Sequence, residues 1–386
     1  MSTTLLTRRP RPTLHRRDRL QAARMDWVLI AAALALSLLG CALIASAGSA
    51  TAVGTSGAKR QLIAILVAVV LAYAVTRLEP RSLRAWTPAL YLISIAALLL
   101  PYSPMGVSIA GARAWVALPL GFTVQPSEFA KLALIAALAA TLATGPRDEV
   151  IANDTVVRAL AIAGLPLAIV LVGNDTGSAM IISGIVAVVM VVAGVSWKWL
   201  AGLAATGVVV ATGAIGLGLL ADYQMQRLLS FLDPTADPYG AGLNTIQARI
   251  AVGSGGLTGR GLFDGPQTQG GFVPVNDSDF VFSVAAEELG LLGALLLLGL
   301  LAVILWRGLS IAFDSRDMFG RLIAVGVVAW FGIQAFENIG MNLGVTPVTG
   351  VTLPFVSYGG SSMIAAWLGI GLLQLVRLSS NPPPRT

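Results

Sequence analysis

The chain has 386 residues, of which 56% are hydrophobic and only 11% are charged. Because a soluble domain averages about 25% charged residues, this composition excludes an ordinary soluble protein and a disordered chain. The single cysteine excludes a disulfide framework, and the single histidine argues against a Ser–His–Asp triad or a His-ligated metal. Any acid–base chemistry must therefore use carboxylates, lysine, tyrosine or water.

A membrane-spanning helix needs about 20 mostly apolar residues, and ten uncharged runs of the chain reach or approach that length. The sequence therefore predicts an all-α polytopic membrane protein with about ten transmembrane helices. A large external loop, at about residues 222–280, separates the seventh helix from the eighth. The ten runs cover residues 27–58, 61–76, 85–112, 132–146, 159–174, 176–197, 199–221, 289–307, 322–336 and 338–376.

The Lys and Arg residues predict how these helices are oriented. Ten spans place both tails on the same side, and most of the 25 Lys and Arg residues fall on that side. By the positive-inside rule, both termini are therefore cytoplasmic, and the net charge of +6 requires no nucleic-acid partner. The expected organisation is a basic cytoplasmic tail at residues 1–24, a ten-helix domain at 25–377 and a Pro-rich cytoplasmic tail at 378–386.

Two patterns stand out in the external loop. Leu243, Ile246 and Ile250 recur at helical spacing and predict an amphipathic helix on the membrane surface. The glycine-rich run at 253–261 does not have the spacing of a G-x-G-x-x-G nucleotide loop. It predicts a sharp turn in which backbone closely approaches backbone or ligand. A weak anion-binding nest that includes Arg260 is the alternative.

Acidic residues beside the apolar runs are the first candidates for chemistry, because charges are costly in a bilayer. Asp175 lies between the fifth and sixth helices, and Asp279 lies where the eighth begins. Asp279 could instead be a helix N-cap, a position at which Asp is favoured. Glu287 and Glu288 follow on the same helix. Glu288 faces nearly opposite to Asp279, which favours a structural pairing, whereas Glu287 could serve either role.

Cationic residues lie on the same external half. Glu128 and Lys131 are three residues apart at the start of the fourth helix and share a face, as an ordinary ion pair or as part of a site. Arg113 lies just outside the third helix and could also form an interfacial anchor with Trp115. An external cluster of carboxylates with nearby Arg and Lys suits a lipid-linked substrate with an anionic head group.

Glycosyl transfer from a lipid pyrophosphate is one reaction that fits such a cluster. A base must take the proton of the acceptor hydroxyl, and cations must hold the leaving pyrophosphate. Asp279 can be that base if partial burial raises its pKa, and Asp277 would raise it further. The residue pattern alone equally allows a proton-coupled transporter, although no internal repeat supports an inverted-repeat transporter.

A set of ordered motifs runs through the ten-helix domain. They are GARAW (111–115), QPSEFAK (125–131), DTGS (175–178), QARIAVGSGG (247–256) with GRG (259–261), SDFVF (278–282) with EELG (287–290), NIGM (338–341) with PVTG (347–350), and LPFVSYGGSS (353–362). In this order they resemble the SEDS family (shape, elongation, division and sporulation), which includes the RodA and FtsW cell-wall polymerases. The short tails resemble the RodA type more than the FtsW type.

The resemblance implies a peptidoglycan glycosyltransferase. Such an enzyme polymerises lipid II into β-1,4 glycan strands on the outer face of the bacterial cytoplasmic membrane, for cell elongation and shape or for division. The essential acid of the family falls on Asp279, which would be the general base, while Arg113 and Lys131 would stabilise the leaving undecaprenyl pyrophosphate. The family's partner is a class B penicillin-binding protein, a transpeptidase. The residues expected to contact lipid II or the nascent glycan strand are Arg113, Glu128, Lys131, Asp175, Arg260, Glu287 and Ser357.

Three residues depart from the family pattern: Ser278 beside the acid, Asn174 before Asp175, and Glu337 within the ninth helix. No metal-ligand set is predicted, although a divalent cation, Mg²⁺ or Mn²⁺, could assist with the pyrophosphate charge. Two other functions stay open. A lipid II flippase predicts polar residues along the whole depth of the bundle, and a non-catalytic activator of the transpeptidase predicts that Asp279 is dispensable.

Overall fold

A computed structural model of the chain describes residues 24–49, 56–109, 111–118, 122–143, 151–218, 222–233 and 242–380. Helices dominate, and a small sheet lies beside them. The elements are α2 (Trp27–Ser49), α3 (Ser56–Thr76), α4 (Pro80–Leu99), η1 (Leu100–Tyr102), β1 (Gly106–Ile109), β2 (Ala112–Leu118), β3 (Phe122–Val124), α5 (Pro126–Leu142), α6 (Asn153–Val172), α7 (Thr176–Ala193), α8 (Trp197–Gly216), α9 (Asp222–Leu232), α10 (Leu243–Ser254), α11 (Pro266–Gln269), α12 (Val281–Asp314), α13 (Met318–Leu343) and α14 (Gly360–Ser380).

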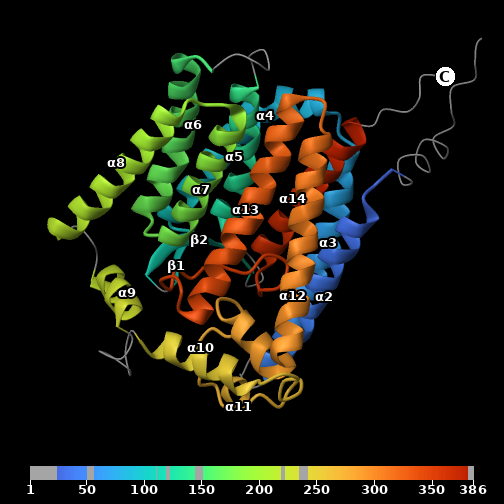
Figure 1. The fold of residues 1–386 in the computed structure, drawn as a ribbon, viewed down its shortest axis with the longest axis vertical. Coiled ribbons are helices and arrows are strands. Elements are labelled where there is room, and N and C mark those ends of the chain that lie inside the picture. The colour runs from blue at the N-terminus through green and yellow to red at the C-terminus, as the bar shows by residue number, and fades with distance from the viewer. Residues whose placement is uncertain are drawn as a thin grey trace, which may run out of the picture.

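The long helices form a bundle (Figure 1). Nine of the described helices are long and apolar enough to cross a membrane. The tenth expected span is α5, whose 17 residues extend about 26 Å at 1.5 Å per residue, close to the thickness of the hydrocarbon layer. The all-α polytopic class is thereby confirmed. Helices α13 and α14 are the most buried, whereas α8 leans away from the bundle and has no buried residue.

The two ends of the described chain meet at one end of the bundle, as an even number of spans requires. The carboxylate of the buried Asp26 accepts hydrogen bonds from Arg307 at 2.8 and 2.5 Å. The side-chain amide of Gln374 bonds both the N–H and the C=O of Asp26, which joins α14 to the start of α2. Helix α14 continues to Ser380, so it includes the first residues of the predicted tail at 378–386. The rest of both predicted tails lies outside the described residues.

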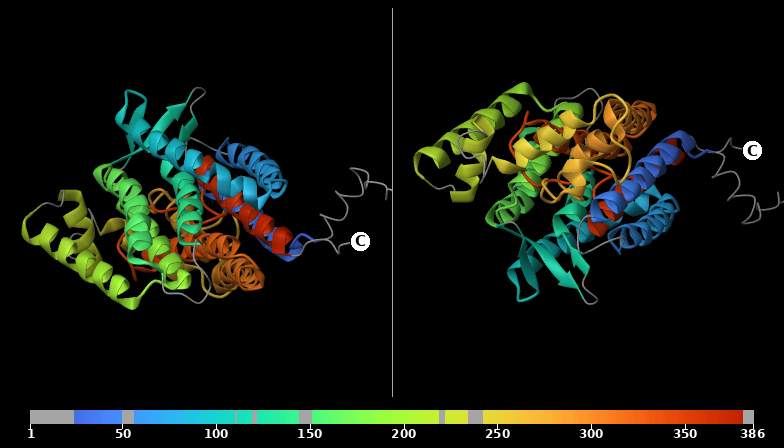
Figure 2. Two further views of the ribbon diagram at one scale, coloured as in Figure 1. Left: turned by 90° about the horizontal axis from the view of Figure 1, so that it is seen from above. Right: turned by 90° about the horizontal axis from the view of Figure 1, so that it is seen from below.

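The prediction of one helix from the run at 85–112 is wrong in its second half. Helix α4 ends at Leu99, and η1 leads into a three-stranded antiparallel sheet in the order β1, β2, β3. Pro101 and Pro104 cannot donate helical hydrogen bonds, and the β-branched residues that follow favour strands. The sheet projects from one side of the bundle, while α8 and α9 project from another (Figure 2).

The large loop predicted between the seventh and eighth spans lies between α8 and α12 and contains α9, α10 and α11. Helix α10 is the predicted amphipathic helix, but it buries its small residues Thr245, Ala248 and Ala251, and it packs against α12 and α13. Ile250 of the predicted apolar stripe is exposed. The loop is therefore anchored to the bundle through the close approach of a small-residue face.

The glycine-rich turn after α10 makes the close backbone approach that its sequence predicts. A Cβ atom on Gly259 would lie 2.1 Å from the carbonyl oxygen of Glu288. The helical geometry of α12 is interrupted at Gly290 (φ 68°, ψ −166°), where a Cβ atom would lie 2.2 Å from the nitrogen of Gly259. Only glycine fits at both positions, because any side chain would collide with the opposing backbone.

The last predicted run, 338–376, also divides. Its first residues complete α13, a loop at 344–359 follows, and α14 begins at Gly360. The loop folds back into the bundle and buries Leu353, Phe355 and Val356. It thereby forms a wall at the end of the bundle opposite to the two chain ends.

Candidate active site

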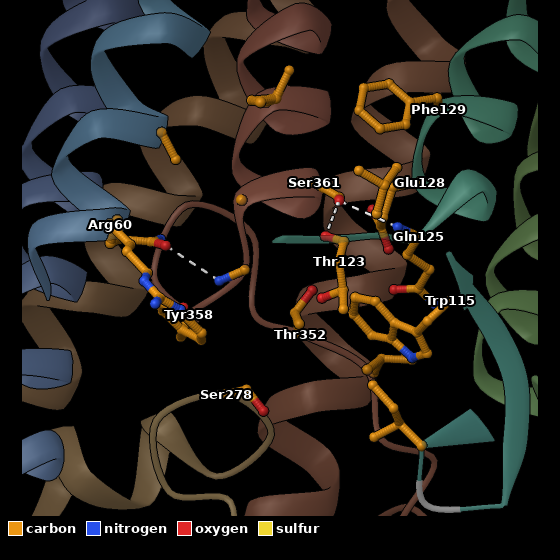
Figure 3. Close-up of a pocket in the computed structure, with 18 of the residues that line it drawn as sticks. Arg60, Trp115, Thr123, Gln125, Glu128, Phe129, Ser278, Thr352, Tyr358 and Ser361 are labelled. Carbon is orange, nitrogen blue, oxygen red and sulfur yellow. Dashed lines mark hydrogen bonds between the residues drawn. The ribbon is translucent and has the colours of Figure 1, made fainter. Parts of the chain in front are cut away.

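A cavity of about 550 Å³ opens at the end of the bundle opposite to the two chain ends (Figure 3). Its walls come from the N-terminal parts of α3, α5, α7 and α14, from the three strands, and from the loops that precede α12 and α14. Three of the predicted acids, Asp279, Asp175 and Glu128, line it together. Because helix N-termini carry partial positive charge, four of them around one cavity favour an anionic ligand.

Asp279 lies in the loop before α12 and is half-buried in the cavity wall. The alternative role as a helix cap is wrong, because the N-cap of α12 is Phe280. The Oδ1 atom of Asp279 accepts a hydrogen bond from the hydroxyl of Ser278 at 3.0 Å. Gly350 packs beside the other oxygen: it adopts a φ of 73°, and a Cβ atom there would lie 3.3 Å from Oδ2. Ser278, which departs from the family pattern, thus still supplies a hydroxyl to the acid.

Burial is the largest influence on the Asp279 carboxyl, and it raises the pKa to about 6 from an ordinary value of 3.8. The hydrogen bond from Ser278 and the positive charge of Arg227 lower this pKa, and the negative charge of Asp277 raises it. At neutral pH the carboxyl is mostly ionised, yet it is a stronger base than an ordinary aspartate. That combination suits a group that accepts a proton.

Asp175 is the N-cap of α7 and is held by several donors. Its Oδ1 accepts the N–H of Ser178 at 3.0 Å, and its Oδ2 accepts the Gln125 amide at 3.0 Å and the Ser178 hydroxyl at 2.7 Å. Asn174 adopts a left-handed φ of 60°, which asparagine tolerates better than most residues. The departure at position 174 therefore fits the turn that presents Asp175. With its oxygens already bonded, Asp175 ties α5 to α7 at the cavity edge.

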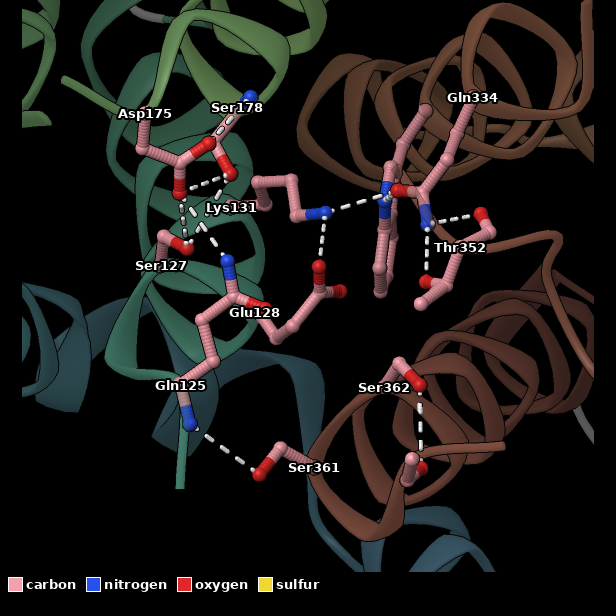
Figure 4. A network of polar contacts seen from close by, with 12 residues as sticks. Gln125, Ser127, Glu128, Lys131, Asp175, Ser178, Gln334, Thr352, Ser361 and Ser362 are labelled. Carbon is pink, nitrogen blue, oxygen red and sulfur yellow. Dashed lines mark hydrogen bonds and ion pairs between the residues drawn. The ribbon is translucent and has the colours of Figure 1, made fainter. Parts of the chain in front are cut away.

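Glu128 and Lys131 form an ion pair inside the bundle (Figure 4). The fully buried Lys131 Nζ lies 2.9 Å from Glu128 Oε1, 2.8 Å from Gln334 Oε1 and 4.9 Å from the centre of the Trp330 ring. Glu128 lines the cavity and Lys131 does not. Within the described residues, the buried Oε2 of Glu128 has no hydrogen-bond partner. Lys131 therefore neutralises Glu128 at the cavity wall.

Arg113 does not line the main cavity. The Nε atom of Arg113 donates to the carbonyl oxygen of Pro101 at 2.9 Å, and its guanidinium lies 6.0 Å from the centre of the Tyr102 ring. The side chain borders a small separate pocket together with Asp175. These contacts of Arg113 hold strand β2, and with it the sheet, against η1.

Three further predicted residues hold the loops around the cavity without lining it. The Glu287 carboxylate accepts the N–H and the hydroxyl of Thr268 at 2.9 and 2.6 Å. The backbone N–H of Arg260 donates to the carbonyl oxygen of Glu287, so it is not free to bind an anion. The buried hydroxyl of Ser357 donates to the carbonyl oxygen of Ser278 at 2.5 Å. Ser357 thus joins the loop before α14 to the loop that carries Asp279.

Comparison with known proteins agrees with this geometry. The sequence model of the FtsW/RodA/SpoVE family, described as cell cycle proteins, matches residues 26–381. The chain belongs to this family, the SEDS family. Stage V sporulation protein E of Bacillus subtilis is 37% identical over 317 residues, which cover 82% of this chain and 85% of that protein. The peptidoglycan glycosyltransferase MrdB of Escherichia coli K12 is 37% identical over 319 residues, with the same coverage.

A solved structure described as the structural coordination of polymerization and crosslinking by a peptidoglycan synthase complex matches with a TM-score of 0.78. The sequence identity is 33%, and the match covers 92% of this chain and 98% of that one. Since the sporulation protein and MrdB are equally similar to this chain, overall identity does not separate the types within the SEDS family.

The main cavity residue that the sequence did not reveal is Arg60 of α3. Within the described residues, it is the only Lys or Arg that lines the main cavity, and it is exposed there beside Tyr358 (Figure 3). Its signal was present in the sequence: the Lys59–Arg60 pair lies on the predicted external side, where the positive-inside rule expects few cations.

Beyond Arg60 and Gln61, the part of α3 that lines the cavity is apolar. Ile63 and Val67 line it and also belong to the exposed apolar surface of that helix. Phe129 of α5, which lies beside Glu128 (Figure 3), and Ile364 of α14 are further apolar residues of the lining. The cavity therefore combines a polar region around the acids with an apolar region that reaches the lipid-facing surface.

Proposed function

We propose that this SEDS protein is a peptidoglycan glycosyltransferase, the activity for which its relative MrdB is named, and that it polymerises lipid II into β-1,4 glycan strands. The observation that carries the proposal is the composition of one cavity. A carboxyl group with a raised pKa, an exposed guanidinium and an apolar wall open to lipid lie together there. These are the groups that a lipid-linked sugar pyrophosphate requires.

In the proposed reaction, Asp279 is the general base. It takes the proton from the C4 hydroxyl of the acceptor GlcNAc while the hydroxyl oxygen attacks C1 of the MurNAc at the lipid-linked end of the growing strand. The bond between C1 and the pyrophosphate oxygen breaks, and undecaprenyl pyrophosphate leaves with the bonding electrons. Attack on the face opposite to the α-linked phosphate gives the β-1,4 bond with inversion.

Arg60 is the cation best placed to stabilise the leaving pyrophosphate. The roles expected for Arg113 and Lys131 fit less well, because Arg113 bonds the Pro101 carbonyl outside the cavity and Lys131 is buried against Glu128. A guanidinium pairs with phosphate oxygens in two parallel hydrogen bonds. The N-termini of four helices around the cavity add partial positive charge.

A divalent cation that enters with the pyrophosphate would be held mainly by substrate oxygens. Within the described residues, no group of three or more His, Cys, Asp or Glu side chains could hold a metal ion. Mg²⁺ commonly binds through one or two carboxylates together with substrate phosphates.

We further propose that the cavity faces the outside of the bacterial cytoplasmic membrane and that both termini are cytoplasmic, as the distribution of Lys and Arg predicts. The flippase alternative expects polar side chains along the depth of the bundle. The three acids and Arg60 instead gather at the outer ends of the helices, which supports the enzyme. The partner we propose is a class B penicillin-binding protein, because a similar chain belongs to a complex that polymerises and crosslinks.

The test is to incubate the purified chain in liposomes with labelled lipid II, with and without a class B penicillin-binding protein, and to resolve the products on a gel. We expect a ladder of glycan strands that a muramidase digests. Transfer of intact lipid II between the leaflets without a ladder would instead support the flippase. Absence of both a ladder and lipid II transfer, together with faster crosslinking by the partner transpeptidase on preformed strands, would support the activator.

A further inference from the structure

Helix α13 carries three side-chain amides in a single buried row. Gln334, Asn338 and Asn342 are spaced by four residues, so they lie on one face of the helix. They are 2%, 0% and 0% exposed. We call these three residues the amide row. Amides are costly to bury unless they are hydrogen-bonded, and the bonds of these three lead to both charged centres of the cavity.

Gln334 connects the buried ion pair to the cavity wall (Figure 4). Its Oε1 accepts hydrogen bonds from Lys131 Nζ at 2.8 Å and from Trp330 Nε1 at 2.6 Å. Its Nε2 donates to the carbonyl oxygen of Thr352 at 2.9 Å and to the hydroxyl of Thr352 at 3.1 Å. Thr352 lines the cavity. One amide therefore fixes both Lys131 and the loop opposite to it.

Asn338 and Asn342 hold the backbone of Asp279 from the same helix. The Nδ2 atom of Asn338 donates to the carbonyl oxygen of Asp279 at 2.9 Å and to that of Val351 at 2.7 Å. The Nδ2 atom of Asn342 donates to the same Asp279 oxygen at 3.0 Å. The Oδ1 atom of Asn342 accepts the N–H and the hydroxyl of Ser283, in the first turn of α12. The peptide group that joins Asp279 to α12 is thus fixed by two amides.

We propose that the amide row positions Asp279 for proton transfer and keeps it in register with the Glu128–Lys131 pair and with the loop at 350–352. Asp279 lies two residues before the first residue of α12, and no helical hydrogen bond holds its carbonyl group in place. Asn338 also bonds Val351, whose neighbour Gly350 packs beside the Asp279 carboxylate. The row contacts backbone and not substrate, so its members are positioning residues. The inference rests on the proposed role of Asp279 as base.

The test compares Asn338→Leu with a matched variant, Gln374→Leu. Gln374 is also a buried amide with two backbone hydrogen bonds, but it lies at the opposite end of the bundle beside Asp26. In full-length protein, we expect Asn338→Leu to lower kcat for lipid II polymerisation by about 10–100-fold, with KM within about threefold. Gln374→Leu should lower the melting temperature to a similar degree and leave kcat within about twofold.

Equal kcat in the two variants would overturn the proposal. Should Asn338→Leu fail to fold, Asn338→Ser serves, because serine is too short to reach both carbonyl groups. A second readout does not depend on turnover: labelling of Asp279 by a hydrophobic carbodiimide, followed by mass spectrometry of the peptide. We expect the labelling rate to change in the Asn338 variant and to stay at the wild-type value in Gln374→Leu. A wild-type rate in both would overturn the positioning role, whereas absence of polymerisation by the wild type would count against the proposed function alone.

Discussion

The pH dependence of polymerisation tests the base most quantitatively. Burial raises the pKa of Asp279 to about 6, and a base works only when it is ionised. Activity should therefore be lost as pH falls through about 6. At pH 5 about a tenth of an acid with this pKa is ionised. An aspartate with the ordinary pKa of 3.8 would still be more than about 90% ionised at pH 5. The two cases differ by roughly tenfold in kcat/KM at this pH.

The assay measures kcat/KM for lipid II between pH 4.5 and 8.5, because this parameter reports the free enzyme. Two variants separate the titration of Asp279 from that of the substrate pyrophosphate. Asp277→Asn removes a charge that raises the Asp279 pKa, so the acid limb should move to lower pH. Arg227→Gln removes a charge that lowers it, so the limb should move to higher pH. An acid limb near pH 4, or a shift of both variants in the same direction, would refute the reasoning.

Three other predictions concern the residues around the cavity. Arg60→Gln should lower kcat/KM for lipid II polymerisation by about 10²–10³-fold. The control is Lys59→Gln, which removes an adjacent exposed cation that does not line the cavity and should leave kcat/KM within about twofold of the wild type; equal losses in the two variants would contradict the role of Arg60. Lys131→Met should cost about 3–5 kcal/mol of stability, because it leaves Glu128 buried without its ion-pair partner. Adding Glu128→Leu should restore part of this stability in thermal melting, and a double variant no more stable than Lys131→Met would contradict the prediction. Glu287→Gln should lower the melting temperature and speed proteolysis of residues 255–270 while KM stays unchanged, because the Glu287 carboxylate holds Thr268 in that loop. A raised KM without loss of stability would instead indicate that Glu287 contacts the substrate.

The fold was largely predictable because spans are encoded by long apolar runs and by the asymmetry of Lys and Arg. The two wrong stretches, 85–112 and 338–376, are both apolar segments that contain prolines and glycines. Hydropathy measures whether a segment avoids water, and it does not distinguish a helix from a strand or a loop packed inside protein. Strands β1 to β3 and the loop before α14 are apolar because they pack against the rest of the protein, and not because they are helices.

The site was predictable where a charge stood out against an apolar background. Asp279, Asp175 and Glu128 were predicted because each is an acid beside an apolar run, and all three line the one cavity. The direction in which a side chain points was not predictable, since Lys131 turns inward to Glu128 and Trp330.

Neutral amides were missed altogether, because a single Asn or Gln in a helix has no fixed meaning. The spacing of Gln334, Asn338 and Asn342 by four residues was nevertheless visible in the sequence. In an apolar helix, such a row of amides on one face needs buried hydrogen-bond partners. It was therefore a signal of close packing against polar backbone.

The most direct test of the central claim compares Asp279→Asn with Asp277→Asn in lipid II polymerisation, with each folded variant reconstituted beside its partner transpeptidase. Asparagine keeps the size and most hydrogen bonding of aspartate but cannot take a proton. Loss of the general base should lower the rate by at least about 10²-fold, so we expect no ladder from Asp279→Asn and a full ladder from Asp277→Asn. A full ladder from a folded Asp279→Asn variant would contradict the assignment of Asp279 as the base.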